Sequence, residues 1–176
     1  MSEAMRVPKA DTQVPATSNG VRVERLCNTD RARLAAHFLA LSPKRLADRF
    51  GAVIRDGIER GYVAQLDLDR DIVVALSEAD GTILATAQVS SPTRDAHWAE
   101  LCFTALPGET ESHACERAIT VAVAQARQAN LALLVVNGPG FDSQTRALLG
   151  RVGFDLVIHE GGITGEMALR DPNDGG

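Results

Sequence analysis

Residues 98–136 read WAELCFTALPGETESHACERAITVAVAQARQANLALLVV. This stretch predicts a strand over 98–104, a long helix over 112–130 and a second strand over 131–136. The second strand is an unbroken apolar run, which is typical of a strand covered on both faces. A strand, a helix and a buried strand in this order form a parallel crossover unit. We therefore expect one parallel strand pair inside a sheet that is otherwise built from hairpins.

The patterns on either side of this stretch alternate between strand and helix. The further predicted strands are residues 21–26, 72–76, 83–89, 154–158 and 164–169. The further helices begin at Thr29 or Asp30, at Ser42-Pro43, and at Asp142 or Ser143. The element order is therefore β-α-α-β-β-β-α-β-α-β-β, which places the chain in the α/β (α+β) class.

The length of 176 residues suits one domain. Residues 1–20 are polar with little apolar pattern, and we expect a disordered leader there. Residues 21–170 carry the periodic patterns and form the single predicted domain. Residues 171–176 are expected to be a tail.

The composition excludes several classes of partner. The net charge is −5, from 18 basic and 23 acidic residues, so a nucleic-acid partner is not expected. No apolar run approaches the roughly 18 residues of a membrane span, and the first 20 residues lack a signal-peptide core. The three cysteines are an odd number without CxxC spacing. Reduced thiols in a cytoplasmic protein are the simplest interpretation.

Three local strings, residues 41–45 with 49–50, 99–103 and 146–154, resemble the GNAT acetyltransferase superfamily. The resemblance covers roughly residues 21–170. It implies a GNAT-like mixed, mostly antiparallel sheet of about seven strands with helices on both faces. It also implies an acyl-CoA-dependent N-acyltransferase that uses acetyl-CoA or another acyl-CoA. The acceptor would be an amine of a small molecule or a protein.

The resemblance also implies roles for individual residues. Some family members use a Glu at the position of Glu100 as the general base for the attacking amine. An exposed strand carboxylate without a catalytic role is the alternative interpretation of Glu100. The implied cofactor-binding positions lie near the end of the fourth strand and at the starts of two later helices: Phe103, Ala105, Ser112, His113, Cys115 and Asp142.

The loop before the long helix departs from the family pattern. The family signature is Pro followed by Gln/Arg-x-x-Gly-x-Gly/Ala, and His113 and Cys115 stand where it has glycines. Glu109 and Glu111 add carboxylates where a diphosphate would approach the helix N-terminus. Charge and side-chain bulk therefore both predict weak or absent acetyl-CoA binding. The alternative function of this loop is simply to cap a helix.

Other residues limit the chemistry. Many family members carry a Tyr that protonates the leaving thiolate, and here that position is Leu149. The single Tyr of the chain, Tyr62, lies in a different segment. The histidines and cysteines do not show the short spacings of structural zinc sites, so we expect no metal.

Two hypotheses for the function follow. The first is an N-acyltransferase, and the second is a GNAT-fold binding or regulatory module that has lost acetyl-CoA. A homodimer is left open. The resemblance further implies that the sheet opens between 98–104 and 131–136. We expect no intramolecular disulfide.

Overall fold

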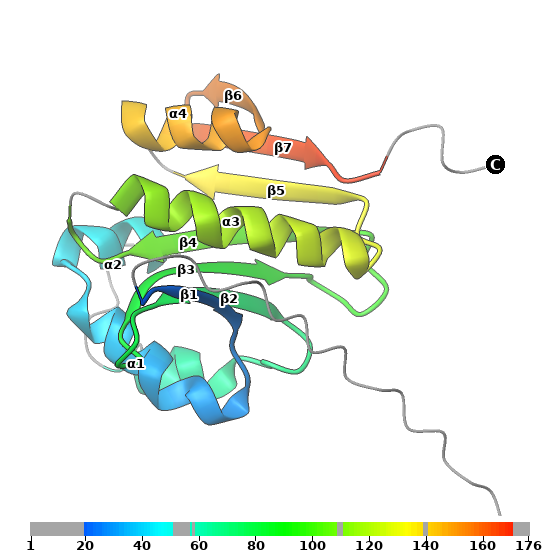
Figure 1. The fold of residues 1–176 in the computed structure, drawn as a ribbon. Coiled ribbons are helices and arrows are strands. Elements are labelled where there is room, and N and C mark those ends of the chain that lie inside the picture. The colour runs from blue at the N-terminus through cyan, green and yellow to red at the C-terminus, as the bar shows by residue number, and fades with distance from the viewer. Residues whose placement is uncertain (1–19, 51–56, 58, 109–110, 139–140, 171–176) are drawn as a thin grey trace, which may run out of the picture.

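The computed structural model describes residues 20–50, 57, 59–108, 111–138 and 141–170. Apart from Gly20, the predicted leader and tail lie outside these residues. Seven strands form one sheet in the order β1-β2-β3-β4-β5-β7-β6 (Figure 1). The strands are β1 (Arg22–Arg25), β2 (Ile72–Ser77), β3 (Ile83–Ser90), β4 (Trp98–Ala105), β5 (Leu133–Gly138), β6 (Asp155–His159) and β7 (Gly162–Ala168). The β4–β5 pair is parallel and every other pair is antiparallel, so the predicted mixed sheet is confirmed.

Helices cover parts of both faces of this sheet. The four α-helices are α1 (Arg31–Ala40), α2 (Pro43–Phe50), α3 (Glu111–Gln128) and α4 (Ser143–Val152). Short helical turns lie at Asn28–Asp30 and Glu59–Val63. One hydrophobic core lies under α3 and α4, and a second lies under α1 and the 59–63 turn. In Figure 1, α3 crosses in front of the strands while α1 and α2 lie at the lower left.

Strand β2 shows why the sheet needs both helical layers. Every residue of β2 is buried. Ile72, Val74 and Leu76 belong to the core under α3, whereas Val73 and Ala75 belong to the core under α1. Because successive strand side chains point to opposite faces, a strand that is apolar at every position requires cover on both sides.

The crossover that the sequence predicts is present, with shifted boundaries. The strand expected at 131–136 begins at Leu133 and continues to Gly138. The preceding residues complete the exit from α3: Asn130 has a positive φ of 62°, and the Leu131 N–H donates to the Ala126 carbonyl. Leu131 therefore belongs to the turn, whereas Ala132 already bonds to both sides: its N–H donates to the His97 carbonyl, and its carbonyl accepts from the Leu169 N–H.

The two parallel strands part after three residue pairs. Trp98, Ala99 and Glu100 pair with Leu133, Leu134 and Val135, and strand pairing stops there. Both strands continue past this point, to Ala105 and Gly138. The predicted opening of the sheet between these strands is confirmed, and it creates a cleft at their carboxyl ends.

Candidate functional site

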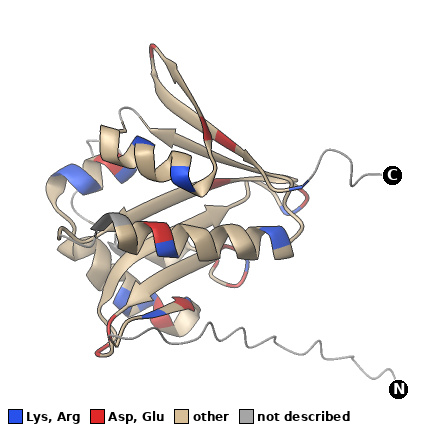
Figure 2. Cartoon of the chain, turned by 45° about the horizontal axis from the view of Figure 1, so that its top comes forward, with Lys and Arg blue, Asp and Glu red and all other residues tan. Residues whose placement is uncertain are grey.

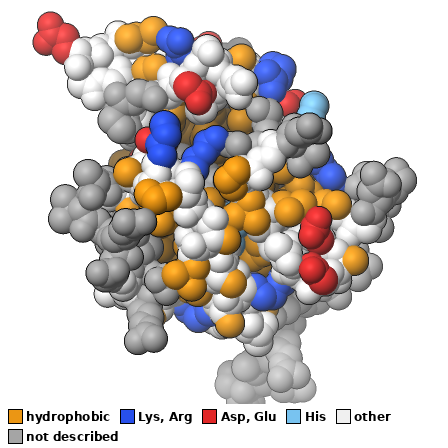
Figure 3. Space-filling model, turned by 90° about the vertical axis from the view of Figure 1, so that its left-hand side faces the viewer, with side chains coloured by type: hydrophobic (Ala, Val, Ile, Leu, Met, Phe, Trp, Pro, Cys, Tyr) orange, Lys and Arg blue, Asp and Glu red, His pale blue; other side chains and the backbone are white. Residues whose placement is uncertain are grey.

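A cavity of about 310 Å³ lies where β4 and β5 part. Its walls come from β4, from the end of β5, from α2 and from the first turn of α4. Figure 3 shows this side of the molecule, where basic side chains lie next to hydrophobic ones. In an open sheet, the carboxyl ends of parallel strands are a common place for a ligand site.

Glu100 lies at the inner end of this cleft. It is the last β4 residue that pairs with β5, and its side chain is half-buried. Asn137, on β5 just beyond the last pair, donates from Nδ2 to the Glu100 Oε1 at 3.4 Å. A carboxylate held at the point where the strands part can accept a proton from a group bound in the cleft. Sequence reasoning missed Asn137, although a polar residue directly after a buried strand is a readable signal.

Two aromatic rings form the apolar part of the wall. Phe103 and Phe141 stack with their ring centroids 6.4 Å apart and their planes 29° from parallel. A side chain at position 138 would collide with the Phe141 ring, so Gly138 allows that ring to lie against the end of β5. The cleft therefore combines an apolar surface with the carboxylate of Glu100.

Three basic residues of α2 line the same cleft: Lys44, Arg45 and Arg49. The Lys44 Nζ pairs with Asp48 at 2.7 Å, and both side chains are largely exposed. No Lys or Arg occurs in the sequence from 100 to 116. The structure nonetheless brings these cations to the site from a distant segment, and sequence reasoning missed them.

Asp142 shows how closely α2 approaches the start of α4. Its Oδ1 accepts a hydrogen bond from the Thr145 N–H at 2.8 Å, which makes Asp142 the N-cap of α4. That hydrogen bond, together with the charges of Arg45 and Lys44, lowers the pKa of Asp142. The carboxylate is therefore ionised and faces the cations of α2 across the cleft.

A polar network lies behind the cleft, on the α1 side of β4. The Tyr62 hydroxyl donates to the Gln88 Oε1, and the Arg49 Nη2 lies 2.6 Å from the Tyr62 oxygen. Burial raises the pKa of Tyr62, and burial also raises the pKa of the neighbouring Cys102 thiol. Tyr62 does not line the cavity.

His37 on α1 lies behind the same strand and is 3% exposed. Its Nδ1 lies 2.9 Å from the Ile83 carbonyl, and its Nε2 lies 2.8 Å from the Thr104 Oγ1. The Thr86 Oγ1 continues this chain at 2.7 Å from Thr104. Burial lowers the pKa of His37, so the neutral ring is the stable form in the folded protein.

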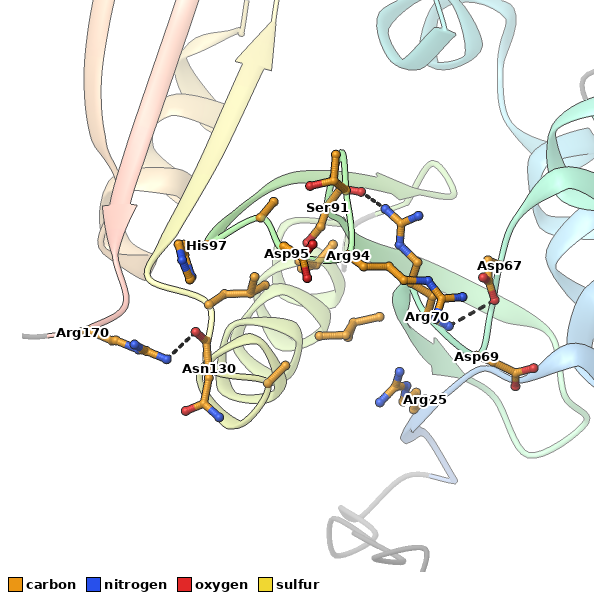
Figure 4. Close-up of a pocket in the computed structure, with 16 residues that line it drawn as sticks. Arg25, Asp67, Asp69, Arg70, Ser91, Arg94, Asp95, His97, Asn130 and Arg170 are labelled. Atoms are coloured by element: carbon orange, nitrogen blue, oxygen red, sulfur yellow. Dashed lines mark hydrogen bonds between the residues drawn. The ribbon is translucent and has the colours of Figure 1, made fainter. Parts of the chain in front are cut away.

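A larger cavity of about 860 Å³ lies at the opposite, amino ends of β4 and β5. We call it the arginine groove, after Arg25, Arg70, Arg94 and Arg170 on its walls (Figure 4). Asp67, Asp69 and Asp95 also line it, and the charged side chains are all exposed. Backbone carbonyls accept hydrogen bonds from three of the arginines. The smaller cleft adds a half-buried carboxylate and two stacked aromatic rings to its charges, so we place the candidate site there.

Neither metal binding nor membrane insertion is indicated in the described part of the chain. No group of three or more His, Cys, Asp or Glu residues there is arranged to hold a metal ion. None of the described helices has the length and apolar character needed to span a membrane. The three cysteines are free: Cys27 is exposed, Cys102 is half-buried and Cys115 is buried.

No protein-family model and no curated protein sequence matches this chain. Solved structures do resemble it. A ribosomal-protein-S5-alanine acetyltransferase from Vibrio fischeri has a TM-score of 0.67 and 14% identity, covering 90% of this chain and 98% of the other. The GNAT domain of PAT from S. lividans has a TM-score of 0.68 and 16% identity, with coverages of 84% and 90%. The protein yncA from Salmonella typhimurium, solved with its cofactor acetyl-CoA, has a TM-score of 0.61 and 14% identity, with coverages of 87% and 96%.

The chain has the GNAT fold. The resemblance expected from the sequence is thereby confirmed for the architecture. At sequence identities of 14% and 16%, the similarity is evidence for the fold alone.

The structure brings together three of the site residues that the GNAT resemblance implied. Glu100, Phe103 and Asp142 line the cleft. Ala105 is 1% exposed and belongs to the core under α3. His113 is exposed in the first turn of α3 and does not line the cavity. Ser112 lies in the same turn, with its side chain outside the described structure.

Cys115 requires a correction to the argument from side-chain bulk. Its side chain is 5% exposed and packs in the core under α3, and burial raises the pKa of the thiol to about 12. A side chain that points into the core does not cover the start of the helix. The steric argument is therefore wrong for Cys115. Glu109 and Thr110 lie outside the described residues, so the charge argument for this loop stays a prediction.

Proposed function

We propose that this protein is an acyl-CoA-dependent N-acyltransferase whose acceptor is an amine of a small molecule or a protein. One observation carries the proposal. The parallel pairing of β4 and β5 stops at the Glu100–Val135 pair, and the cavity beyond it is lined by three carboxylates, two aromatic rings and three basic side chains. The GNAT fold and the acetyltransferase names of its structural neighbours support the same class of reaction.

The described residues fit part of an acyl-CoA molecule. The β4 edge beyond Glu100 is unpaired on the β5 side and offers backbone groups to an extended chain. Phe103 and Phe141 offer apolar contact, and Lys44 and Arg45 offer positive charge to phosphates. The acids at the start of α3 fit less well, because carboxylates repel a diphosphate.

Glu100 is assigned the role of general base. It takes a proton from the amine, directly or through one water, while the amine nitrogen forms a bond to the thioester carbonyl carbon. Asn137 holds the carboxylate by its hydrogen bond to Oε1. Backbone N–H groups near Phe103 stabilise the oxyanion that develops on the carbonyl oxygen. The C–S bond then breaks, and the thiolate takes its proton from water, because Leu149 has none to give.

A non-catalytic module is the second candidate, and one observation favours it. Leu149 is fully buried in the core under α3 and α4, at the position where many relatives place an acidic Tyr. Together with Glu109 and Glu111, it points to a protein that kept the GNAT fold without the chemistry.

Calorimetric titration with acetyl-CoA and with CoA separates these two functions. A dissociation constant below roughly 100 μM, about −5.5 kcal/mol, supports the transferase. An assay of thiol release with a panel of amines then identifies the acceptor class. Absence of heat at millimolar ligand, together with no thiol release, overturns the proposal in favour of the module.

A further inference from the structure

The outer edge of the sheet, strand β6, carries side chains that the folded chain leaves without cover. Val157 and Ile158 are 64% and 68% exposed, although they are adjacent and point to opposite faces. In Figure 2 the β6–β7 hairpin stands at the edge of the molecule. Strand β6 pairs with β7 on one side, and no described strand pairs with its other side. An unpaired strand edge is a template for pairing with another chain.

The two faces of β6 differ in their surroundings. Leu156 packs against the core under α4, on the face where Gly165 and Val136 lie beneath it. Asp155, Val157 and His159 line the opposite face, together with Thr164 and Glu166 of β7. The described helices of that opposite face, α1 and α2, pack against other parts of the sheet. This part of the sheet therefore has one covered and one bare face.

We propose that β6 pairs antiparallel with β6 of a second copy of this chain, about a two-fold axis at Val157. The strand reads Asp155-Leu156-Val157-Ile158-His159. In this register Asp155 of each copy lies opposite His159 of the other, and Val157 lies opposite its own equivalent. Leu156 lies opposite Ile158 on the α4 face, whereas the Asp155–His159 pairs and the Val157 pair lie on the bare face.

Hydrogen-bond complementarity selects this register and this partner. A shift one way places Asp155 opposite Ile158 or Val157 instead of His159, and a shift the other way places it opposite Glu160 or Gly161. Within one copy, Asp155 lies directly opposite Glu166 of β7, and like charges in such a pair are unfavourable. The second copy's histidine offers an N–H donor to the Asp155 carboxylate. His159 now contacts the Thr164 Oγ1 through Nε2 at 3.0 Å, while its Nδ1 accepts from the Gly161 N–H at 3.2 Å, so it is the Nε2–H that would turn to the new carboxylate.

The same pairing covers apolar side chains that are exposed in a single copy. Ile158 gains Leu156 of the other copy as a neighbour, which extends the apolar surface beside α4 across the axis. The resulting interface is isologous, because each copy contributes the same strand. A five-residue strand pair is a small interface, so we expect dissociation constants in the micromolar range.

Disulfide trapping tests the register. In a Cys27→Ser background, which removes the exposed native thiol, Val157→Cys places two thiols directly opposite, about 5 Å apart at Cα and within disulfide range. Ile158→Cys is the matched control, because its equivalents lie about 8 Å apart. We expect Val157→Cys to form a covalent dimer under mild oxidation at least tenfold faster than Ile158→Cys. Equal rates, or no cross-link at either position, overturn the proposal.

A charge exchange tests the complementarity by sedimentation at roughly 100 μM protein. Asp155→Lys and His159→Glu should each weaken the dimer at least tenfold, and the double variant should restore it. Asp95→Lys in the arginine groove should leave it unchanged. A monomeric wild type, single variants that stay dimeric, or a double variant that stays monomeric each contradict the pairing. Circular dichroism of every variant verifies that the monomer is folded.

Discussion

The two ends of the β4–β5 pair differ in strand pairing, in the volume of the cavity and in the side chains that line it. At the amino ends the strands are paired, and the arginine groove beside them has about 860 Å³ and exposed charges of both signs. At the carboxyl ends the strands part, and the cleft has only about 310 Å³. The smaller cavity holds the half-buried Glu100 and two stacked aromatic rings.

On the proposed assignment, the site lies in the smaller of these two cavities. A ligand is held by directional groups in a sheltered place, and exposed opposing charges are largely satisfied by solvent. The parting of two strands supplies both shelter and unpaired backbone groups. The functional assignment can therefore be tested by making the same chemical change at both ends.

The largest expected effect comes from neutralising one carboxylate at each end. Glu100→Gln should lower kcat/KM for acyl transfer at least hundredfold, about 2.7 kcal/mol, because the amine loses its general base. Asp95→Asn in the arginine groove should change it less than twofold. Steady-state rates of thiol release measure both. If Glu100→Gln transfers acyl groups at the wild-type rate, Glu100 is only a strand carboxylate.

Removing two cations together at each end should have the next largest effect. Lys44→Gln combined with Arg45→Gln should weaken acetyl-CoA binding about tenfold, about 1.4 kcal/mol, since the phosphates lose favourable charge. Arg70→Gln combined with Arg94→Gln is the matched change in the arginine groove and should alter the affinity less than twofold. Competition calorimetry at two salt concentrations gives the affinities, and the cleft effect should shrink at higher salt. A larger loss in the groove variant would move the cofactor site to the other end.

The sequence predicted the parts of this comparison that depend on neighbouring residues. Residues 98–136 encode a strand, a helix and a buried strand in one continuous pattern, so the crossover was readable, whereas the opening of the sheet was predicted from the GNAT resemblance. Glu100, Phe103 and Asp142 were found because a resemblance marked their positions. Their place in the cleft follows from the same local elements.

The features that the sequence did not predict depend on packing between residues far apart in the chain. Lys44 and Arg45 reach the cleft because α2 folds against β4, more than fifty residues later in the chain. His37 is buried because a carbonyl and a hydroxyl, 46 and 67 residues away, satisfy its ring. The Cys115 side chain faces the core, which a comparison of aligned letters does not reveal. The periodicity of the sequence does not encode contacts between residues so far apart in the chain.

The start of α3 provides a third and smaller test of the cleft. Glu109→Gln combined with Glu111→Gln should tighten acetyl-CoA binding about fivefold, about 1 kcal/mol, because two carboxylates no longer oppose the phosphates. Cys115 is retained, since its side chain fills the core. Asp67→Asn combined with Asp69→Asn removes the same charge in the arginine groove and should give no comparable gain. A wild type that already binds at micromolar levels, or an equal gain in both variants, contradicts the local charge effect.

The smallest expected effect separates two histidines at the two ends. His37 is buried behind the cleft, whereas His97 is exposed in the arginine groove. Burial lowers the pKa of His37, so below about pH 6.5 the unfolded chain binds a proton that the folded protein resists. Unfolding free energy should therefore fall by up to about 0.7 kcal/mol from pH 7 to pH 6, because the unfolded histidine holds half a proton on average over that interval. Urea unfolding at both pH values should show this loss in wild type and in His97→Gln, but not in His37→Gln. Burial raises the pKa of Asp71, which acts with the opposite sign, but it is present in all three proteins and cancels in the comparison. An unchanged slope in His37→Gln would show that its ring accepts a proton in the folded state, and the buried chain through Thr104 would then not depend on a neutral ring.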